Sequence, residues 1–385
     1  MTDPLQPAVV RQVTQELVRI PSINPTLAPE EGRGEAAVAA FARDWMAAHG
    51  LRSWLEEPAP GRPNAVGECG NGQGRTLVLC AHLDTVSAAG MTIPAFDGYV
   101  EGNRVYGRGA YDMKGSAAAV LCAAAAMAQK PFDGKLMVAL VSDEEYASIG
   151  AQHFVAHHTA DACILTEASA GKLILAHKGF VWAEIVTSGK AAHGSRWDLG
   201  ISAIGKMGHI VTALEDFDRN VLRRRQHPLV GPASQHCALV GGGTGLSTYA
   251  ERCSLQIERR TLPGEDTDAV LAELREVIAR TGESAEVRCI LARPPLTCDR
   301  DEAVAAHLRQ AARKLTGRLP EEAGVGYWMD AALFAAAGIP TVNYGPDGAG
   351  AHEAVEWVDI DSVAQCAAVL AEAARTFFAG ELSSR

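Results

Sequence analysis

The sequence predicts an α/β fold in which a mostly parallel sheet carries an inserted, smaller α+β domain. Helix-like and strand-like segments alternate from residue 1 to about 177, and the alternation returns from about residue 293. Strand-like runs in this part, such as 76–86 (TLVLCAHLDTV), are apolar, as expected of parallel strands buried on both faces. In the middle of the chain, strands recur around two helices, a pattern typical of a small sheet with helices on one face. We therefore expect a discontinuous first domain, residues 1–177 and 293–385, and an inserted domain, residues 178–292.

Each predicted element has a local reason. The second of two helices expected at about 5–20 and 34–49 ends at Gly50, which suits a C-cap. The alanine content of 112–130 favours a helix. The first domain is completed by strands at 135–145, 160–167 and 339–344, a helix at 301–316 and a final alanine-rich helix. In and beside the insert we expect strands at 173–179, 180–189, 235–241, 251–260 and 285–294, and helices at 201–217 and 266–280.

Composition excludes several classes of function. A chain of 385 residues with 48% hydrophobic residues is long enough for two domains and a large core. The net charge of −11 argues against nucleic-acid binding. No stretch approaches about 18 continuous apolar residues, and the first residues lack a basic region followed by an apolar one, so we expect neither a membrane span nor a secretion signal. Nine scattered cysteines without a C-x-x-C pair predict reduced thiols and a cytoplasmic protein.

Polar side chains follow several of the predicted strands. His82 and Asp84 lie two positions apart at the end of strand 76–86, so their side chains point the same way. The Asp84 carboxylate can then accept the second ring N–H of a metal-bound His82 and fix its orientation. The alternative is that this pair is simply hydrogen-bonded structure at a strand end.

Further acidic groups occur at comparable positions. Asp112 opens the alanine-rich helix, where it is either an N-cap or a carboxylate that bridges two cations. Strand 135–145 ends in three acids, and Glu144 and Glu145 can have different roles only if the backbone turns there. Glu167 ends strand 160–167, and His352 follows strand 339–344 in a glycine-rich loop. Ligands of open α/β sheets gather at the carboxyl ends of strands, so we expect a metal site there.

Taken in order, these motifs resemble the M20 family of zinc-dependent amidohydrolases over nearly the whole chain. The resemblance implies that His82 and Glu167 hold one divalent metal ion, that Glu145 and His352 hold a second, and that Asp112 bridges the two. Zinc suits such ligands, and cobalt or manganese are alternatives. Glu144 would be the general base, which takes a proton from a metal-bound water and passes it to the departing amine. The family also implies a cis peptide after Asp112.

The same resemblance assigns roles in the insert, which would be a dimerisation or lid domain of a homodimer. His193, in GKAAHGS, would reach the active site of the partner subunit and stabilise the oxyanion. Arg260, in ERRTLPGE, would contact a substrate carboxylate. Ser247 stands where many relatives carry asparagine, which leaves substrate contacts there open. Trp328 stands in a segment where relatives have small residues, and it would either line the substrate pocket or pack.

The expected function is hydrolysis of the amide bond of a small N-acyl amino acid, with acetylornithine deacetylase as the nearest named activity. The family's dipeptidases, carboxypeptidases and succinyl-diaminopimelate desuccinylase share every catalytic residue and remain alternatives. Glu167 favours a deacylase, because many dipeptidase relatives carry aspartate at this position. A catalytically silent binding protein would be expected to lack part of the metal set, and that set is complete here. An enzyme that uses one metal ion stays open.

Overall fold

The computed structural model describes residues 3–380 and separates the chain into two compact units. The first unit comprises Met1–Leu175, Cys298–Ala323 and Met329–Arg385, and the second comprises Ala176–Thr297 and Gly324–Trp328. The second unit therefore extends beyond the predicted insert at both ends and includes a short later segment. Residues that are far apart in sequence build the first unit, as expected of a domain interrupted by an insertion.

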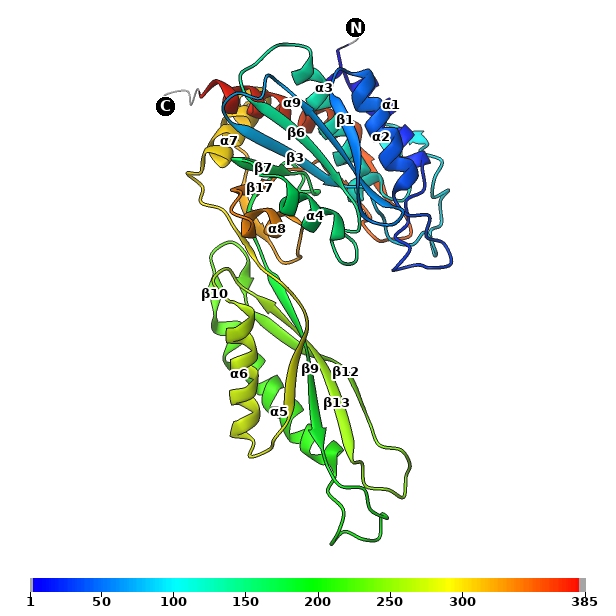
Figure 1. Cartoon of the computed structure of the whole chain (residues 1–385), viewed down its shortest axis with the longest axis vertical. Coiled ribbons are helices and arrows are strands. Elements are labelled where there is room, and N and C mark those ends of the chain that lie inside the picture. Colours follow the sequence, from blue (N-terminus) through cyan, green and yellow to red (C-terminus); the bar gives the residue numbers. More distant parts are fainter. Residues whose placement is uncertain (1–2, 381–385) are drawn as a thin grey trace. The chain divides into compact units, whose positions relative to one another are not determined.

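The first unit is built on a sheet in which strands follow the order β1-β2-β6-β3-β7-β17-β8 (Figure 1). These strands are β1 (Arg52–Ala59), β2 (Arg62–Cys69), β3 (Thr76–His82), β6 (Lys135–Val141), β7 (Ala162–Leu165), β17 (Thr341–Asn343) and β8 (Leu173–His177). The four central strands β6, β3, β7 and β17 are parallel, whereas the flanking strands pair antiparallel. The mostly parallel sheet predicted from the apolar runs is thus confirmed.

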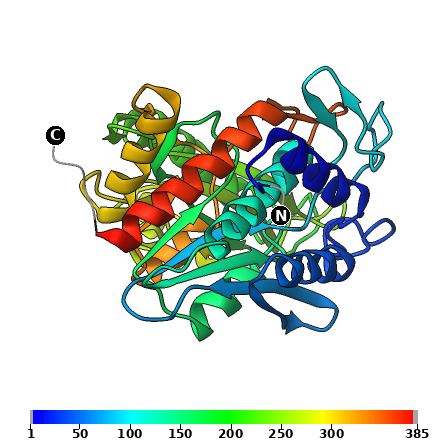
Figure 2. The same cartoon turned by 90° about the horizontal axis from the view of Figure 1, so that it is seen from above.

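Helices cover both faces of this sheet, which explains the apolar runs. They are α1 (Pro7–Arg19), α2 (Ala36–Ala48), α3 (Gly115–Ala128), α4 (Ile149–His157), α7 (Ala303–Thr316), α8 (Ala331–Ala336) and α9 (Ile360–Ala379). Figure 1 shows α4 and α8 on the face opposite to α3 and α9. Viewed from above, the long α9 lies between α7 and α3 (Figure 2). Because α3 packs against helices as well as strands, small alanines are buried around its whole circumference.

A smaller sheet completes the first unit, in the order β18-β19-β5-β4. Its strands are β4 (Val100–Glu101), β5 (Arg104–Tyr106), β18 (Gly348–Ala349) and β19 (Trp357–Asp359). The sequence analysis did not predict this sheet, whose strands are two or three residues long, or the β1–β2 hairpin, in which β1 is half-exposed and β2 contains Pro63 and Gly67. It also extended three strands too far. β3 ends at His82, β6 at Val141 and β7 at Leu165, so the acidic residues that follow lie in loops.

The second unit has its own sheet and core. Its antiparallel sheet runs β12-β13-β9-β14, formed by β9 (Gly179–Ser188), β12 (Ser234–Gly242), β13 (Arg252–Thr261) and β14 (Glu286–Arg293). Helices α5 (Ala203–Asn220) and α6 (Thr267–Arg280) pack on it around apolar residues such as Ile185, Leu214 and Leu274. The short strands β10 (Gln226–His227) and β11 (Gly231–Pro232) pair with each other, and a helical turn spans Leu222–Arg224. Two further short strands, β15 (Leu296–Thr297) and β16 (Glu322–Val325), pair with β8. The helical turn Ala110–Lys114 belongs to the first unit.

None of the helices described between residues 3 and 380 combines the length and apolar character that crossing a membrane requires. The nine cysteines are all free thiols, and several of them, including Cys80, Cys122 and Cys163, are buried in the first unit.

Candidate metal centre

His82 is the last residue of β3 and is almost completely buried. Its Nδ1 lies 3.0 Å from the carbonyl oxygen of Asp84, which can only accept a hydrogen bond, so Nδ1 carries the proton. Its Nε2 faces two carboxylates, 3.1 Å from Asp112 Oδ1 and 3.3 Å from Glu167 Oε1. A lone pair on Nε2 is repelled by carboxylate oxygens unless a proton or a cation lies between them. The ring is therefore oriented as a metal-bound histidine requires.

The Asp84 carboxylate has a different main role from the one expected. Its Oδ1 lies 3.5 Å from His82 Nδ1, so it supports the ring by charge while the shorter hydrogen bond goes to the backbone carbonyl. The carboxylate instead accepts the backbone N–H groups of Glu144 at 3.0 Å and Glu145 at 3.1 Å, and the Asn24 amide at 2.8 Å. Burial would raise the pKa of Asp84, but His82 and these donors outweigh it and lower the pKa. Asp84 therefore fixes the loop that presents the two glutamates.

The backbone turns at Asp143, as separate roles for Glu144 and Glu145 require. Asp143 has a φ of 70°, in the left-handed region, directly after β6 ends. Its Oδ1 accepts hydrogen bonds from Arg62 Nη2 at 2.8 Å and from Asn24 Nδ2 at 2.9 Å. Arg62 also forms a buried two-bond pair with Glu35. This buried network holds an uncommon backbone conformation in place.

Asp112 does not cap a helix, which decides between its two alternatives. It lies in non-helical backbone before a cis peptide to Met113, and α3 begins only at Gly115. Its Oδ1 lies 3.1 Å from His82 Nε2, and its Oδ2 lies 3.3 Å from His352 Nε2. One carboxylate thus faces two imidazoles with its two oxygens. This is the arrangement that a bridging ligand needs.

His352 approaches from the glycine-rich loop after β17. Its Nε2 lies 3.1 Å from Glu145 Oε2, and its own backbone is left-handed, with a φ of 62°. Gly350 makes this turn possible, because it has a φ of 85° and an added Cβ would collide with the carbonyl of Val355. His352 is half-exposed, whereas His82 is buried, so the two histidines differ in access to solvent.

The electrostatics of the cluster fit divalent cations. Burial raises the pKa of Glu145 to about 7, raises that of Glu144 far above its usual range and also raises that of Glu167. Hydrogen bonds to Asp112 and Glu145 raise the pKa of His352 to about 10. The pKa of His82 is also raised, because neighbouring carboxylates outweigh the burial that disfavours its charge. The acids therefore outnumber the cations in a buried space, a charge balance that metal ions correct.

Two groups of side chains could hold a metal ion. One group is His82, Glu144 and Glu167, and the other is His82, Asp112 and Glu145. In each group, the ligand atoms, one from each residue, lie within 4.8 Å of one another. His352 adds a further imidazole nitrogen next to Asp112 and Glu145. The structure thus brings together all of the sequence-predicted metal ligands and Glu144.

Sequence reasoning missed the buried residues that support this cluster. Arg62, Glu35 and Asn24 hold the Asp143 turn, and Glu356 accepts backbone N–H groups around Asp112. Asp330 is buried close enough to the cluster for Glu167 and Asp84 to influence its charge, and burial raises its pKa to about 7. Arg62 is the first residue of β2, and no local pattern in the sequence marks it or its partners for such a role.

The remaining predicted site residues belong to the second unit, and their roles stay predictions. His193 is exposed and its Nδ1 contacts the Ser195 hydroxyl at 2.8 Å, while Gly194 N–H donates to the carbonyl of Ser247 at 2.7 Å. Arg260, on β13, pairs with Glu258 at 2.7 Å, and its guanidinium lies over the ring of Phe180.

Trp328, in the same unit, packs against the Phe180 ring, and its indole N–H donates to the Pro294 carbonyl at 3.0 Å. This contact favours packing, the second of the two alternatives.

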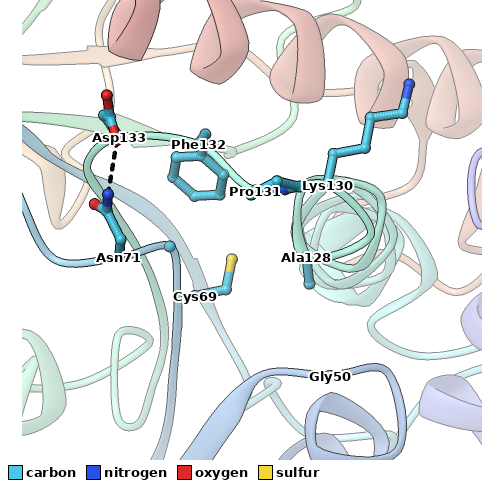
Figure 3. Close-up of a pocket in the computed structure, with 9 residues that line it drawn as sticks. Gly50, Cys69, Asn71, Ala128, Lys130, Pro131, Phe132 and Asp133 are labelled. Carbon is cyan, nitrogen blue, oxygen red and sulfur yellow. Dashed lines mark hydrogen bonds between the residues drawn. The ribbon is translucent and has the colours of Figure 1, made fainter.

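A hollow of about 640 Å³ lies elsewhere in the first unit (Figure 3). It is lined by residues that include Gly50, Cys69, Lys130 and Phe132, and an Asn71–Asp133 hydrogen bond borders it. Gly50 precedes β1, Cys69 ends β2, Asn71 precedes β3, and Lys130 and Phe132 precede β6. The hollow therefore lies at the amino ends of the parallel strands. It is therefore separate from the metal centre at their carboxyl ends.

Comparison with known proteins agrees with this geometry. The peptidase family M20/M25/M40 matches residues 78–376. The acetylornithine deacetylase of Myxococcus xanthus is 30% identical over 322 residues, 81% of this chain and 83% of that protein. The acetylornithine deacetylase of Vibrio vulnificus is 30% identical over 248 residues, 63% of this chain and 65% of that protein.

Solved structures share the fold at lower identity. Aminopeptidase PepT of Bacillus cereus has a TM-score of 0.78 at 19% identity, over 96% of this chain and 98% of that one. The YXEP protein of Bacillus subtilis, described as a dinuclear metal binding peptidase, has a TM-score of 0.74 at 18% identity, over 97% and 98%. The chain therefore belongs to peptidase family M20/M25/M40 and is a metal-dependent hydrolase.

Proposed function

We propose that this protein hydrolyses the amide bond of a small N-acyl amino acid and releases a free amine and a carboxylate. One observation carries the proposal. The two oxygens of Asp112 face the Nε2 atoms of His82 and His352, with Glu145 and Glu167 beside them. This donor set suits two divalent ions, and its imidazole and carboxylate ligands favour Zn²⁺, with Co²⁺ and Mn²⁺ as alternatives.

The proposed ligands are His82 and Glu167 for one ion and Glu145 and His352 for the other, with Asp112 shared. When bound, the ions would polarise the scissile carbonyl and lower the pKa of the attacking water. Asp84 keeps the proton of His82 on the side away from the cluster by placing its carbonyl against Nδ1. It also holds the backbone of both glutamates by its carboxylate.

Glu144 is the proposed general base. Within residues 3–380, the structure shows no hydrogen bond to its carboxylate, which lies close to those of the metal-ligand candidates. Burial raises its pKa, so the carboxylate accepts a proton readily and can hold it until the amine departs. Glu144 would thus take a proton from the attacking water and deliver it to the leaving nitrogen.

Residues of the second unit would complete the site in a homodimer. We propose that His193 stabilises the oxyanion in the active site of the partner subunit, that Arg260 contacts the substrate carboxylate, and that Ser247 contributes a substrate contact. Exposed apolar side chains in this unit support a dimer interface within residues 178–292. They include Trp197, Ile201, Leu239, Val240 and Leu246.

The relatives suggest two substrate classes. Relatives at 30% identity are named acetylornithine deacetylases, which supports N-acetylornithine or a similar N-acyl amino acid. The aminopeptidase with a similar fold supports a dipeptidase or other peptidase as the second candidate. Succinyl-diaminopimelate is a further candidate within the deacylase class. A small charged metabolite of this kind fits the proposed cytoplasmic location.

The test is amine release from N-acetyl and N-succinyl amino acids and from dipeptides, with Zn²⁺- or Co²⁺-loaded protein. Metal-free protein and Glu144→Gln are the controls, and circular dichroism verifies that the variant is folded. Metal-dependent cleavage of an N-acyl amino acid, reduced by about 10²-fold or more in the variant, supports the proposal. Cleavage of dipeptides alone favours the peptidase, and two bound metals without any cleavage favour a silent binding protein.

A further inference from the structure

Glu356 connects the two loops that carry Asp112 and His352. It lies four residues after His352 and has no exposed surface. Its Oε1 accepts the backbone N–H groups of Tyr111 and Asp112, both at 3.0 Å. Its Oε2 accepts the Gly109 N–H at 3.0 Å and Arg108 Nη1 at 2.7 Å. One side chain thus receives four hydrogen bonds, all of them from the segment 108–112.

Arg108 extends these contacts to the loop that follows β3. Its Nε donates to the carbonyl of Ser87 at 3.0 Å, and its Nη2 donates to the carbonyl of Glu353 at 3.2 Å. Both partners of the Arg108–Glu356 ion pair are buried. The pair therefore joins three loops: the one after β3, the one before α3 and the one before β19. Because the two charges neutralise each other, no unpaired charge is left in the interior.

We infer that Glu356 is a positioning residue that sets the separation between Asp112 and His352, and so controls the affinity of the second metal ion. This inference rests on the proposed two-metal centre. His352 reaches Asp112 Oδ2 at 3.3 Å only if the loop 350–356 stays against the segment 108–112. The nearest backbone hydrogen bonds lie just outside these segments, from Gly107 N–H to the Glu356 carbonyl and in the pairing of β5 with β19.

The first metal position depends less on Glu356, because Glu356 holds only one of its three proposed ligands, the shared Asp112. His82 ends β3, and Glu167 lies two residues after β7, which is the parallel neighbour of β3. The ring of His82 is fixed by the carbonyl of Asp84, not by the loop of Glu356. Loss of Glu356 should therefore weaken one metal position selectively, which a general loss of structure would not do.

The chain offers a matched control in the same loop. Glu353 is adjacent to His352 in sequence, but its side chain is exposed, and it holds Arg108 through its backbone carbonyl. In Glu356→Gln, an NH₂ group replaces one of the two acceptor oxygens. This group cannot accept the hydrogen bonds that the replaced oxygen receives in the wild type. Glu353→Gln makes the same chemical change at a position that receives no such bonds.

The test is Co²⁺ binding to metal-free protein, followed by calorimetry and by the visible absorption of the bound ion. Wild type and Glu353→Gln should bind two equivalents with the same affinities. Glu356→Gln should bind the first equivalent as wild type does and the second about 10–100-fold more weakly, as is typical for outer partners of metal ligands. If Glu356→Gln does not fold, Glu356→Asp takes its place, because it keeps the charge but withdraws both oxygens from the N–H groups.

Two results would overturn the inference alone. One is a Glu356 variant with two wild-type affinities, and the other is a variant in which both equivalents weaken equally. A wild-type protein that binds fewer than two ions would instead overturn the two-metal centre, and this inference with it. Since no substrate is used, an incorrect choice of substrate leaves the result unaffected.

Discussion

At the scale of single residues, Asp84 shows how one buried carboxylate organises a site without touching the reacting atoms. Its two oxygens accept separate backbone N–H groups, from Glu144 and Glu145, and its carbonyl fixes the His82 ring. The proposed general base Glu144 and the proposed ligand Glu145 thus depend on the Asp84 side chain, and the proposed ligand His82 depends on its backbone carbonyl. Its own charge is balanced by the Asn24 amide and by His82.

We predict that Asp84→Asn lowers metal affinity and turnover by about 10–100-fold, as loss of an outer partner of a metal ligand does. Asparagine has one acceptor oxygen, so its NH₂ group must face either the Glu144 or the Glu145 N–H. Metal binding is measured by calorimetry, with the exposed Asp97→Asn as the control. Equal affinities in the two variants would contradict this role.

The candidate metal ligands were largely predictable, and the residues that position them were not. His82, Glu145 and Glu167 lie at or near the ends of predicted strands, His352 follows one, and Asp112 opens a predicted helix. Their order along the chain therefore already placed them at one edge of the sheet. The positioning contacts join residues distant in sequence, such as Arg108 with Glu356 and Asn24 with Asp143. No local periodicity reports such contacts, and only the folded chain reveals them.

At the scale of elements, the loops after the strands matter more than the strands themselves. The sequence analysis extended strand 135–145 through the acids, because the apolar pattern does not mark where a strand ends. The structure ends β6 at Val141 and turns at Asp143. The loop before β19 depends in the same way on Gly350, whose left-handed backbone faces the Val355 carbonyl.

We predict that Gly350→Ala destabilises the protein by more than the roughly 1–2 kcal/mol expected for left-handed backbone alone. An added Cβ at Gly350 collides with a carbonyl, whereas at Gly102, also left-handed, it meets nothing within 4 Å. Urea unfolding of the two alanine variants should therefore separate steric collision from backbone preference. The hypothesis fails if both variants lose the same free energy of unfolding.

Helices α7 and α9 are joined by an ion pair with a defined pH dependence. Glu372 on α9 pairs with Arg375 and with Lys314 on α7, and these cations lower its pKa to about 2 from the ordinary value of 4.5. Because the folded pKa is depressed, the pair stabilises the protein above about pH 4.5. This stabilisation is lost as the pH falls toward 2.

Glu372→Gln should therefore lower the free energy of unfolding at pH 7 by less than about 1 kcal/mol, since solvent screens the pair. The difference from wild type should shrink at pH 3. Urea unfolding of metal-free protein at both pH values measures it, and a difference that does not change with pH would reject this account.

At the scale of the whole molecule, each unit has its own apolar core. The core of the first unit lies between the main sheet and its helices, and that of the second lies between α5, α6 and the antiparallel sheet. The α/β pattern and the presence of an insertion were predictable, because both change the periodicity over long stretches. In contrast, the sequence could not predict that residues 324–328 belong to the second unit, because a five-residue segment carries no periodic signal.

The second unit also leaves an edge strand open. Among the strands described between residues 3 and 380, β12 pairs only with β13, and Leu239 and Val240 on it are 64% and 67% exposed. Such an edge invites pairing with another chain. We predict that Val240→Lys converts the proposed homodimer to a monomer, because a charged edge opposes strand pairing. Light scattering after gel filtration measures the mass, and calorimetry should show unchanged metal binding.

If wild type is already a monomer at the same concentration, the proposed dimer is wrong. If Val240→Lys stays dimeric, the interface lies elsewhere in the second unit. Either result would also bear on His193, whose proposed role requires a partner subunit.

The second unit separates Glu167 from His352 along the chain, and this order matters for biosynthesis. A ribosome makes His82 and the four clustered acids first, then the whole second unit, and only afterwards the second histidine. The strand β17 and helix α9, which complete the main sheet and its cover, also come late. A nascent chain therefore carries an acidic cluster that is short of one ligand for much of its synthesis. A product truncated after the second unit would lack a finished centre.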